Sequence, residues 1–385
     1  MRILIIHNYY QHKGGEDVVF QQEYDLLRKE HEVYTLTFQN KKGLKGLIQY
    51  LLYPWNIFAY RKVQKYIKKI NPDIVHVHNT HYGSGPVVIQ AAKKLQKPVV
   101  LSLHNFRLLC PSATLFYNGK IFLDSITQKF PWTAVRNKVL DNSLAKTFLT
   151  AFTYYIHQKL KTWQKVDLYL PLANFSKDLL LTSKRNIKAE QITVKPNFIT
   201  ITAKVRIAED FYLYVGRLSL EKGIIELIRA FKKSGKQLII VGSGPLKDQI
   251  KNDVENEANI HLVGELNKCQ IIDKLAQCKA LIVPSVCYEG GVPLTIIEAL
   301  ACKTPVLASK IGAIADEIKD DSTGWTFNPF NPDSINSAIE KFESTSAIVI
   351  NEITDRAHER YKQHYTKDNV LHILINQYKK LTENE

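Results

Sequence analysis

The sequence contains no long uninterrupted apolar run. Its longest apolar stretches have the length of strands, whereas a membrane-spanning helix needs about 20 predominantly apolar residues in succession. We therefore expect no transmembrane helix. The first run, Ile3 to Ile6, is also brief, and it predicts an opening strand rather than a signal peptide. These two expectations together indicate a cytoplasmic location.

Cysteine is scarce, and its spacing shows no pattern. The chain has five cysteines, and none of them forms a Cys-x-x-Cys pair or stands at metal-ligand spacing from histidine. We expect reduced and mostly buried thiols, and neither a disulfide framework nor a metal site. These cysteines are Cys110, Cys269, Cys278, Cys287 and Cys302.

A complete dinucleotide-binding motif is also missing. Gly14-Gly15 follows the first predicted strand and Gly242-Ser243-Gly244-Pro245 follows a later one. Neither has the three spaced glycines of Gly-x-Gly-x-x-Gly, so nicotinamide chemistry has little support. For Gly14-Gly15, a plain tight turn and a ligand-binding loop are about equally good interpretations.

The composition is that of a globular protein, but the charge is unevenly distributed. With 45% hydrophobic and 23% charged residues over 385 positions, the chain should form two domains with separate cores. Residues 1–200 carry 29 Lys and Arg against 12 Asp and Glu, a net charge of +17, while residues 201–385 carry 23 against 25, a net charge of −2. The basic surplus suggests nucleic acid or an anionic membrane surface as a partner of the first half.

Short runs rich in Val, Ile and Leu alternate with helical patterns along both halves, which is typical of parallel sheets covered by helices on both faces. We predict an α/β fold with one Rossmann-like domain over residues 1–197, a second over residues 198–385, and a last helix near residues 366–381. The predicted strands are Arg2–Asn8, Glu32–Phe38, Asp73–Asn79, Pro98–Asn105, Leu168–Asn174, Phe211–Leu218, Gln237–Gly242, Asn259–Gly264, Ala280–Pro284, Pro305–Ser309 and Trp325–Phe327.

One stretch of the second half is interpreted as a buried strand, a glycine turn and an apolar helix. After the strand, Gly290-Gly291 permits backbone angles that other residues resist, and Pro293 suits the first helical position. The N–H groups that begin such a helix can bind phosphate or sugar hydroxyls. Glu298 lies inside the apolar helix without an evident partner nearby in sequence, and burying an unpaired carboxylate is costly.

Other polar side chains follow predicted strands, which is where open α/β sheets bind ligands. His104 ends the fourth strand, and a structural histidine is about as good an interpretation as a site residue. Arg217 and Lys222 flank the loop after the sixth strand, next to Gly216. This pair could neutralise a diphosphate without a metal, although a solvated pair of charges is by itself the better interpretation.

Residues 41–69 place lysines and an arginine on both sides of an aromatic and apolar stretch, Leu47 to Phe58. Such a pattern suits a membrane interface. A helix pair packed on the sheet with a solvated basic face explains it equally well. A second basic and aromatic segment, residues 129–165, could extend the same surface.

Taken together, these loops resemble those of the retaining glycosyltransferases of family four, which have the GT-B fold. The resemblance covers nearly the whole chain. It implies two Rossmann-like domains facing across a cleft, with the nucleotide-sugar held mainly by the second domain, the acceptor held by the first, and the last helix packing back on the first. The motifs that carry it are Gly14-Gly15, Leu103-His104-Asn105, Gly216-Arg217-Leu218 with Lys222-Gly223, Gly242-Ser243-Gly244-Pro245-Leu246, and Glu289 through Glu298.

The resemblance also implies the roles of individual residues. Arg217 and Lys222, beside Gly216, would hold the donor diphosphate and stabilise it as it leaves, and Glu298 would accept the ribose hydroxyls. Gly14 and Gly15 would approach the phosphates from the first domain.

On the sugar side, the resemblance places His104 near the reacting sugar and Glu289 on the donor sugar. The implied catalytic set is therefore His104, Arg217, Lys222 and Glu289. The donor would be UDP- or GDP-linked, and no separate cofactor or metal is implied. The backbone that would bind the donor sugar is that of Gly290, Gly291, Val292, Pro293 and Leu294.

Two details refine the resemblance. The family usually has seven residues between its two glutamates, whereas Glu289 and Glu298 are separated by eight. We expect the extra residue in the glycine turn, because an insertion within the helix would rotate Glu298 by about 100° off its face. The segment from Arg107 to Pro111 resembles a subgroup that makes bacterial surface polysaccharides. It implies a glycan or lipid-linked acceptor and, with the basic first half, a peripheral position at the inner face of the membrane.

Three functions therefore remain open on the sequence. The first is a retaining glycosyltransferase of bacterial polysaccharide biosynthesis, and the second is a nucleotide-sugar epimerase or hydrolase of the same fold. The third is a non-catalytic nucleic-acid-binding protein. This third hypothesis rests only on the charge of the first half, and the chain has no recognisable nucleic-acid module, so nucleic acid is not an expected partner.

Overall fold

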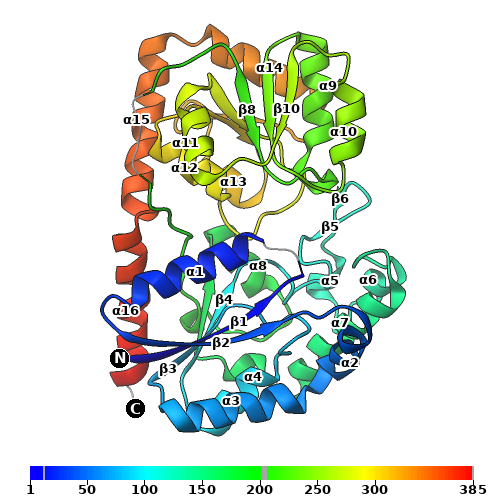
Figure 1. Ribbon diagram of the computed structural model, residues 1–385, viewed down its shortest axis with the longest axis vertical. Coiled ribbons are helices and arrows are strands. Elements are labelled where there is room, and N and C mark those ends of the chain that lie inside the picture. Colours follow the sequence, from blue (N-terminus) through cyan, green and yellow to red (C-terminus); the bar gives the residue numbers. More distant parts are fainter. Residues whose placement is uncertain (12–13, 202–205, 384–385) are drawn as a thin grey trace. The chain divides into compact units, whose positions relative to one another are not determined.

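The computed structural model describes residues 1–11, 14–201 and 206–383 (Figure 1). Contacts between residues divide these into two compact units. Unit 1 comprises Met1–Leu115, Phe122–Lys195 and the chain from Val370 on, and unit 2 comprises Phe116–Ile121 and Pro196–Asn369. The division therefore falls two residues before the predicted boundary, and both units are discontinuous in sequence.

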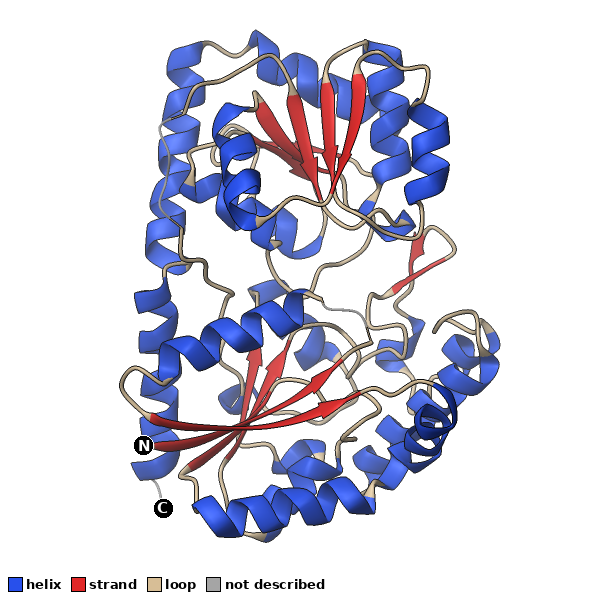
Figure 2. Ribbon diagram, viewed as in Figure 1, coloured by secondary structure: helices blue, strands red, loops and turns tan. Residues whose placement is uncertain are grey.

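Unit 1 is built on a five-stranded sheet whose neighbouring strands are all parallel, in the order β2-β1-β3-β4-β7. The central strand β3 is buried along its whole length, as expected for a parallel strand covered on both faces (Figure 2). The strands are β1 (Arg2–Tyr9), β2 (Glu32–Gln39), β3 (Ile74–Val77), β4 (Val99–Leu103) and β7 (Leu168–Pro171).

Helix α3 (Ile57–Ile70) of unit 1 begins and ends at capping residues. In α3, the side chain of Asn56 accepts a hydrogen bond from the backbone N–H of Ala59 at 3.0 Å, and Asn71 ends the helix in the left-handed region with φ of 43°. The helical elements are α1 (Gly15–Leu27), α2 (Gly43–Leu52), η1 (Tyr53–Trp55), α3 (Ile57–Ile70), α4 (Val87–Lys94), α5 (Asp124–Thr127), α6 (Trp132–Arg136), α7 (Leu144–Lys159), η2 (Trp163–Lys165), α8 (Asn174–Thr182), η3 (Ala189–Gln191) and most of α16 (Lys367–Glu383).

The last helix, α16, contributes to the core of unit 1. Leu374 and Tyr378 pack into the hydrophobic cluster that contains Ile3 and Ile5 of β1. The hydroxyl of Tyr378 also lies 2.7 Å from Nδ1 of His76. These residues place the end of the chain against the first strands of the protein.

Unit 2 contains a six-stranded sheet, again with all neighbours parallel, in the order β10-β9-β8-β11-β12-β13. The strands are β8 (Tyr212–Val215), β9 (Leu238–Val241), β10 (Ile260–Gly264), β11 (Ala280–Val283), β12 (Val306–Ser309) and β13 (Trp325–Phe327). The helical elements are η4 (Leu220–Lys222), α9 (Ile224–Ser234), α10 (Lys247–Val254), α11 (Lys268–Gln277), α12 (Leu294–Ala301), α13 (Gly312–Glu317), α14 (Pro332–Ser344) and α15 (Ala347–His364).

Helices cover both faces of this second sheet (Figure 2). Leu281 of β11 belongs to the cluster formed with α11 and α12, whereas Ala280 and Ile282 belong to the cluster formed with α9 and α14. Successive side chains of a strand point to opposite faces, so a continuous apolar run supplies both clusters.

The predicted α/β class with two parallel-sheet domains is confirmed, and each of the eleven predicted strands coincides with an observed one. The antiparallel hairpin of β5 (Phe116–Tyr117) and β6 (Lys120–Ile121) was not predicted. All five cysteines are free, and only Cys269 is exposed. Among the described residues, no helix combines the length and apolar character required to cross a bilayer.

Candidate functional site

In unit 2 the predicted site residues gather where β8 and β11 end. These strands are parallel neighbours, so the loops that follow them meet at one edge of the sheet. The backbone N–H of Val286 donates to the carbonyl of Glu221 at 3.0 Å and joins the two loops. Gly223 has φ of +68°, and a Cβ there would lie 1.8 Å from the carbonyl oxygen of Pro284. Glycine at 223 is therefore required by this close packing.

Lys222 and Glu289 meet at this edge. Nζ of Lys222 donates to Oε1 of Glu289 at 2.5 Å, and the hydroxyl of Ser285 donates to the same oxygen at 2.9 Å. Burial lowers the pKa of Lys222, but the charge and the hydrogen bond of Glu289, together with smaller effects of Cys287 and Glu221, offset burial, so the pKa lies above its ordinary value. Lys222 is therefore a fixed positive charge, oriented by a carboxylate. The alternative interpretation from the sequence, a solvated charge, does not describe Lys222.

Arg217 lies in the same loop as Lys222 and is exposed. The hydroxyl of Tyr214 donates to its backbone carbonyl at 2.9 Å, which holds the loop in place. No carboxylate of the described residues forms an ion pair with its guanidinium. An unpaired guanidinium beside an oriented ammonium suits an anion with several oxygens.

Glu298 has an ion-pair partner that the sequence did not reveal. Lys268, the first residue of α11, donates to Oε1 of Glu298 across 30 positions of sequence. Glu298 is buried, and burial raises the pKa of its carboxyl group although Lys268 opposes the shift. The partner is distant in sequence, as the absence of an evident neighbour there implied, and the ion pair by itself explains how this buried charge is accommodated.

The start of α12 also differs in detail from the prediction. The helix begins at Leu294 and Pro293 is its N-cap, so Pro293 is not the first helical residue. Neither Gly290 nor Gly291 has a positive φ angle, whereas Gly223 and Gly242 do. No side chain caps the helix, so its first N–H groups are available to the oxygens of a ligand.

In unit 1, His104 follows β4 and stacks on His78. Nε2 of His104 lies 3.1 Å from Nδ1 of His78, and Nε2 of His78 in turn faces Oε2 of Glu23 at 3.4 Å. Burial lowers the pKa of His78 to about 3, and burial followed by the charges of neighbouring histidines lowers the pKa of His104 well below its ordinary value. Both rings are therefore neutral at neutral pH.

The charge of Glu23 favours one tautomer of His78. Nε2 of His78 makes no hydrogen bond to a described residue, but it faces the carboxylate of Glu23 at 3.4 Å, and this negative charge favours the tautomer that carries its proton on Nε2. Nδ1 of His78 is then an acceptor, and His104 must donate from its own Nε2. His104 is thereby held with Nδ1 unprotonated.

The carboxylate of Glu16 lines the same small cavity as His104, and the sequence motifs did not predict it. Asn105 donates to Oε1 of Glu16, and Nδ2 of Asn79 donates to Oε2 of Glu16 at 3.0 Å. Together with His104 and Arg107 these residues line a cavity of about 40 Å³, which is large enough for a water molecule or a hydroxyl group. Burial raises the pKa of Glu16 to about 7, although the hydrogen bond from Asn105 lowers it.

The buried cluster beneath His104 is an ion-pair network. Glu23, His76 and His78 place three potential metal-ligating atoms within 4.8 Å of one another. However, the ammonium of Lys195 binds Oε1 of Glu23. His76 is also engaged at both nitrogens, at 2.7 Å by the hydroxyl of Tyr378 and at 2.9 Å by a serine hydroxyl. Oε1 of Glu23 and both nitrogens of His76 are thus engaged by protein partners, whereas Oε2 of Glu23 and Nε2 of His78 make no hydrogen bond within the described part of the chain.

Gly14 and Gly15 begin α1, where Gly14 is the N-cap. The N–H of Gly14 donates to Oδ2 of Asp17 at 3.0 Å, and Oδ1 of Asp17 lies 2.7 Å from Nε2 of His7. A Cβ at either glycine would meet no atom within 4 Å, and Gly14 has φ of −129°, which any residue adopts. The fold of unit 1 does not itself require glycine at these positions.

Models of two glycosyltransferase families match the two halves of the chain. Residues 12–202 match the model described as Glycosyltransferase Family 4, and residues 200–363 match the model described as Glycosyl transferases group 1. The chain belongs to the family four type of glycosyltransferases.

Curated relatives match parts of the chain. An uncharacterized glycosyltransferase of Methanocaldococcus jannaschii is 29% identical over 181 residues, which cover 44% of this chain and 45% of the relative. O-antigen chain mannosyltransferase C of Escherichia coli is 23% identical over 185 residues, which cover 46% and 49%. The chain thus spans less than half the length of these relatives.

Solved structures match over nearly the whole length. Sucrose-phosphate synthase from Thermosynechococcus elongatus has a TM-score of 0.73 at 16% identity and covers 100% of both chains. The HepE protein of Anabaena, in complex with UDP and glucose, has a TM-score of 0.67 at 15% identity and covers 97% of this chain and 98% of its own. At these identities the likeness shows the fold, which is GT-B.

Proposed function

We propose that this protein is a retaining glycosyltransferase that moves a sugar from a UDP- or GDP-linked donor to a glycan or lipid-linked glycan in bacterial polysaccharide biosynthesis. The observation that carries the proposal is the oriented Lys222–Glu289 pair beside the exposed Arg217. Two positive charges at the carboxyl edge of a parallel sheet suit the diphosphate of a nucleotide-sugar.

In this proposal, Arg217 and Lys222 stabilise the negative charge that develops on the diphosphate as the bond to the anomeric carbon breaks. Such preorganised charge is commonly the largest protein contribution to a group transfer, and it needs no metal. The acceptor hydroxyl forms the new bond to the anomeric carbon on the same face, and its proton passes to the departing phosphate. No side chain acts as a nucleophile.

Glu289 and the backbone that begins α12 would bind the donor sugar, and Glu298 would accept the ribose hydroxyls. Only Oε1 of Glu298 is engaged by Lys268 in the structure. The second carboxylate oxygen is then the acceptor for a ribose hydroxyl.

Unit 1 would bind the acceptor and supply neutral hydrogen-bonding groups to the reacting sugar. His104, with Nδ1 unprotonated, is one such group. The basic charge of unit 1, the exposed apolar residues of α2, and the exposed aromatic residues Trp55 and Phe58 support peripheral binding to an anionic membrane surface. The bacterial polysaccharide acceptor is supported by the Escherichia coli relative.

The test measures ligand binding first and products second. Thermal stabilisation of the protein by UDP, GDP and ADP identifies the nucleotide, because a ligand that binds only the folded state raises its stability. The matching nucleotide-sugar is then incubated with and without acceptor. A new glycosidic bond with the anomeric configuration of the donor supports the proposal. Free or epimerised sugar without acceptor glycosylation would favour the epimerase or hydrolase alternative.

A further inference from the structure

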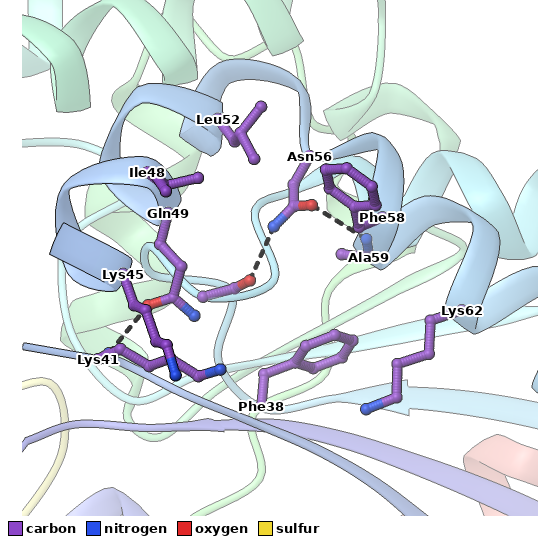
Figure 3. Close-up of a pocket in the computed structure, with 11 residues that line it drawn as sticks. Phe38, Lys41, Lys45, Ile48, Gln49, Leu52, Asn56, Phe58, Ala59 and Lys62 are labelled. Carbon is purple, nitrogen blue, oxygen red and sulfur yellow. Dashed lines mark hydrogen bonds between the residues drawn. The ribbon is translucent and has the colours of Figure 1, made fainter.

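Unit 1 contains a pocket that plays no part in the chemistry described above. It lies between β2, α2 and α3, has a volume of about 320 Å³, and is at the lower end of the range of about 300–1,000 Å³ for ligand sites. Figure 3 shows that Lys41 and Lys45 extend toward one side of Phe38 and that Lys62 lies on its other side. The remaining lining residues are Ile48, Gln49, Leu52, Asn56, Phe58, Ala59 and Gly83.

The rim of this pocket carries three uncompensated positive charges. Within the described part of the chain, no carboxylate forms an ion pair with Lys41, Lys45 or Lys62. Nζ of Lys62 lies 4.9 Å from the centre of the Phe38 ring, a cation–π contact that places its charge at the pocket without neutralising it. An anion with at least two charges would satisfy this arrangement.

The polar side chains of the pocket wall form hydrogen bonds to the backbone, and these bonds fix the shape of the pocket. The side chain of Asn56 donates to the carbonyl of Gly83 at 2.9 Å and accepts from the N–H of Ala59 at 3.0 Å. The side chain of Gln49 accepts from the N–H of Lys41 at 2.8 Å and donates to a β2 carbonyl at 3.0 Å. The lysine side chains therefore project from a backbone that is held in place.

Beyond the rim, the adjoining helices present apolar side chains to solvent. The helix α2 has no buried residue, although it is rich in leucine and isoleucine. Leu44, Leu51 and Phe58 are 74%, 64% and 67% exposed. Exposed apolar side chains grouped in this way mark a surface that binds another apolar body.

We propose that this pocket binds the phosphate or diphosphate of a single-chain lipid-linked acceptor, whose hydrocarbon chain leaves over α2 toward the bilayer. The inference rests on the proposed glycosyltransferase function and specifies its acceptor class. Three ammonium groups favour a diphosphate with two or more negative charges over the single charge of a phosphodiester phospholipid. The small volume favours one hydrocarbon chain over two.

The position of the pocket within unit 1 fits an acceptor. Phe38 is at the carboxyl end of β2 and Gly83 is in the loop after β3, so the pocket lies at the same edge of the sheet as His104. In the order β2-β1-β3-β4, three strand spacings of about 4.8 Å separate β2 from β4, or about 14 Å. A sugar attached to a diphosphate in the pocket extends along this edge.

The experiment measures direct binding of farnesyl diphosphate, below its micellar concentration, by isothermal titration calorimetry on the full chain. The comparison ligands are inorganic diphosphate, farnesol and dihexanoyl phosphatidylglycerol. We expect farnesyl diphosphate to bind at least about tenfold more tightly than each of them, because only it offers both the charge and the single chain. Equal or tighter binding of dihexanoyl phosphatidylglycerol would assign the pocket to a bilayer lipid, and equal binding of inorganic diphosphate would make it a simple anion site. Either result overturns the proposal.

Two triple variants with the same change of charge test the location. Lys41→Gln/Lys45→Gln/Lys62→Gln should weaken farnesyl diphosphate binding by about tenfold or more. Lys65→Gln/Lys68→Gln/Lys69→Gln removes three exposed lysines of α3 that do not line the pocket, and it should change binding by less than about twofold. Equal losses in both variants would mean that only the net charge matters, and would overturn the proposal.

An apolar pair of variants tests the path of the chain. Phe58→Ser, at the pocket, should weaken farnesyl diphosphate binding and leave inorganic diphosphate binding unchanged. Ile348→Ser, in α15 of unit 2, removes an apolar side chain of similar exposure (73%) that belongs to neither the pocket nor α2, and it should have little effect. Nucleotide binding by unit 2 is a separate readout. Stabilisation by a nucleotide together with absent lipid binding would refute this inference and leave the proposed function standing.

Discussion

Nζ of Lys222 lies 2.5 Å from Oε1 of Glu289, although 67 positions separate the two residues in sequence. Glu289 to Pro293 lie outside α12, which begins at Leu294. With eight residues between Glu289 and Glu298, Glu289 reaches the loop that follows β8. The location of the additional residue in the glycine turn stays a prediction.

This contact predicts that Lys222 and Glu289 act as a unit. Lys222→Ala should lower kcat/KM by about 100- to 1,000-fold, because it removes charge from the developing diphosphate. If Glu289 works mainly by orienting Lys222, Glu289→Gln should add little to Lys222→Ala in a double-mutant cycle. Full additivity would show instead that the contact between the two side chains makes no contribution to the reaction. Lys233→Ala, which removes an exposed lysine of α9, is the control.

The role of Glu298 can be separated from its ion pair. Glu298→Gln should abolish the preference for UDP over 2′,3′-dideoxy-UDP, a preference we expect to be about tenfold or more because the hydroxyls bond to a charged group. Lys268→Ala removes the ion pair but keeps the carboxylate, so it should keep the preference. Calorimetric titration measures both. Equal discrimination by wild type and Glu298→Gln would show that the carboxylate is only structural.

The contact between His78 and His104 predicts a positioning role for His78. His78→Phe keeps a ring of similar size but removes the acceptor for Nε2 of His104. We expect kcat to fall by about tenfold while KM for the donor changes little. Removing the charge effect of His78 should also raise the pKa of His104, so the acid limb of the kcat profile moves to higher pH. His78→Gln, which keeps an acceptor, should restore part of the activity. An unchanged pH profile would argue for packing alone.

The raised pKa of Glu16 predicts that the folded protein loses stability as the pH rises. Burial raises its pKa to about 7 in the folded protein from an ordinary value of 4.5. Between these values the folded state holds more protons than the unfolded state, so stability falls as pH rises through this range. The shift corresponds to up to about 3 kcal/mol. Glu16→Gln cannot ionise, and its melting temperature should therefore fall less than that of wild type between pH 5 and pH 8. Parallel curves would contradict the assignment.

Lys195 and Glu23 form a buried ion pair. We expect that removing the lysine alone destabilises the protein and that neutralising the glutamate as well restores most of the stability. Lys195→Met leaves an unpaired buried carboxylate and should cost about 3–5 kcal/mol. Adding Glu23→Gln removes that charge and should recover most of the loss. Calorimetric melting of the wild type, Lys195→Met and the double variant measures the loss and its recovery. A double variant no more stable than Lys195→Met alone would show that the pair matters by packing and not by charge.

The sequence predicted the sheets better than it predicted the partners of the charged residues. The strands of the two parallel sheets were visible because a buried parallel strand needs a continuous apolar run, whereas the antiparallel hairpin of β5 and β6 was not visible. Lys268 and Glu298 could not be paired in the same way, because 30 positions separate them and no periodicity links them. The same holds for Lys195 and Glu23, which are 172 positions apart.

The sequence also did not predict the burial and protonation of the candidate residues. His104 stood out as the end of a strand, but its neutral state depends on burial and on neighbouring histidines, and its tautomer depends on His78, which in turn faces Glu23. The sequence of residues 41–69 also did not distinguish a membrane interface from a helix pair packed on the sheet. The segment is a helix pair, and one of its helices, α2, has no buried residue.

For this protein, the sequence by itself determined the two α/β domains, their strands, and the loops in which polar residues follow those strands. Local patterns suffice for this, because strand burial and turn chemistry act over a few residues. Only the tertiary structure decided that Lys222 is oriented by Glu289, that Glu298 is paired with Lys268, and that three lysines surround an apolar pocket. Those relationships depend on side chains that are distant in sequence and are brought together when the sheets form.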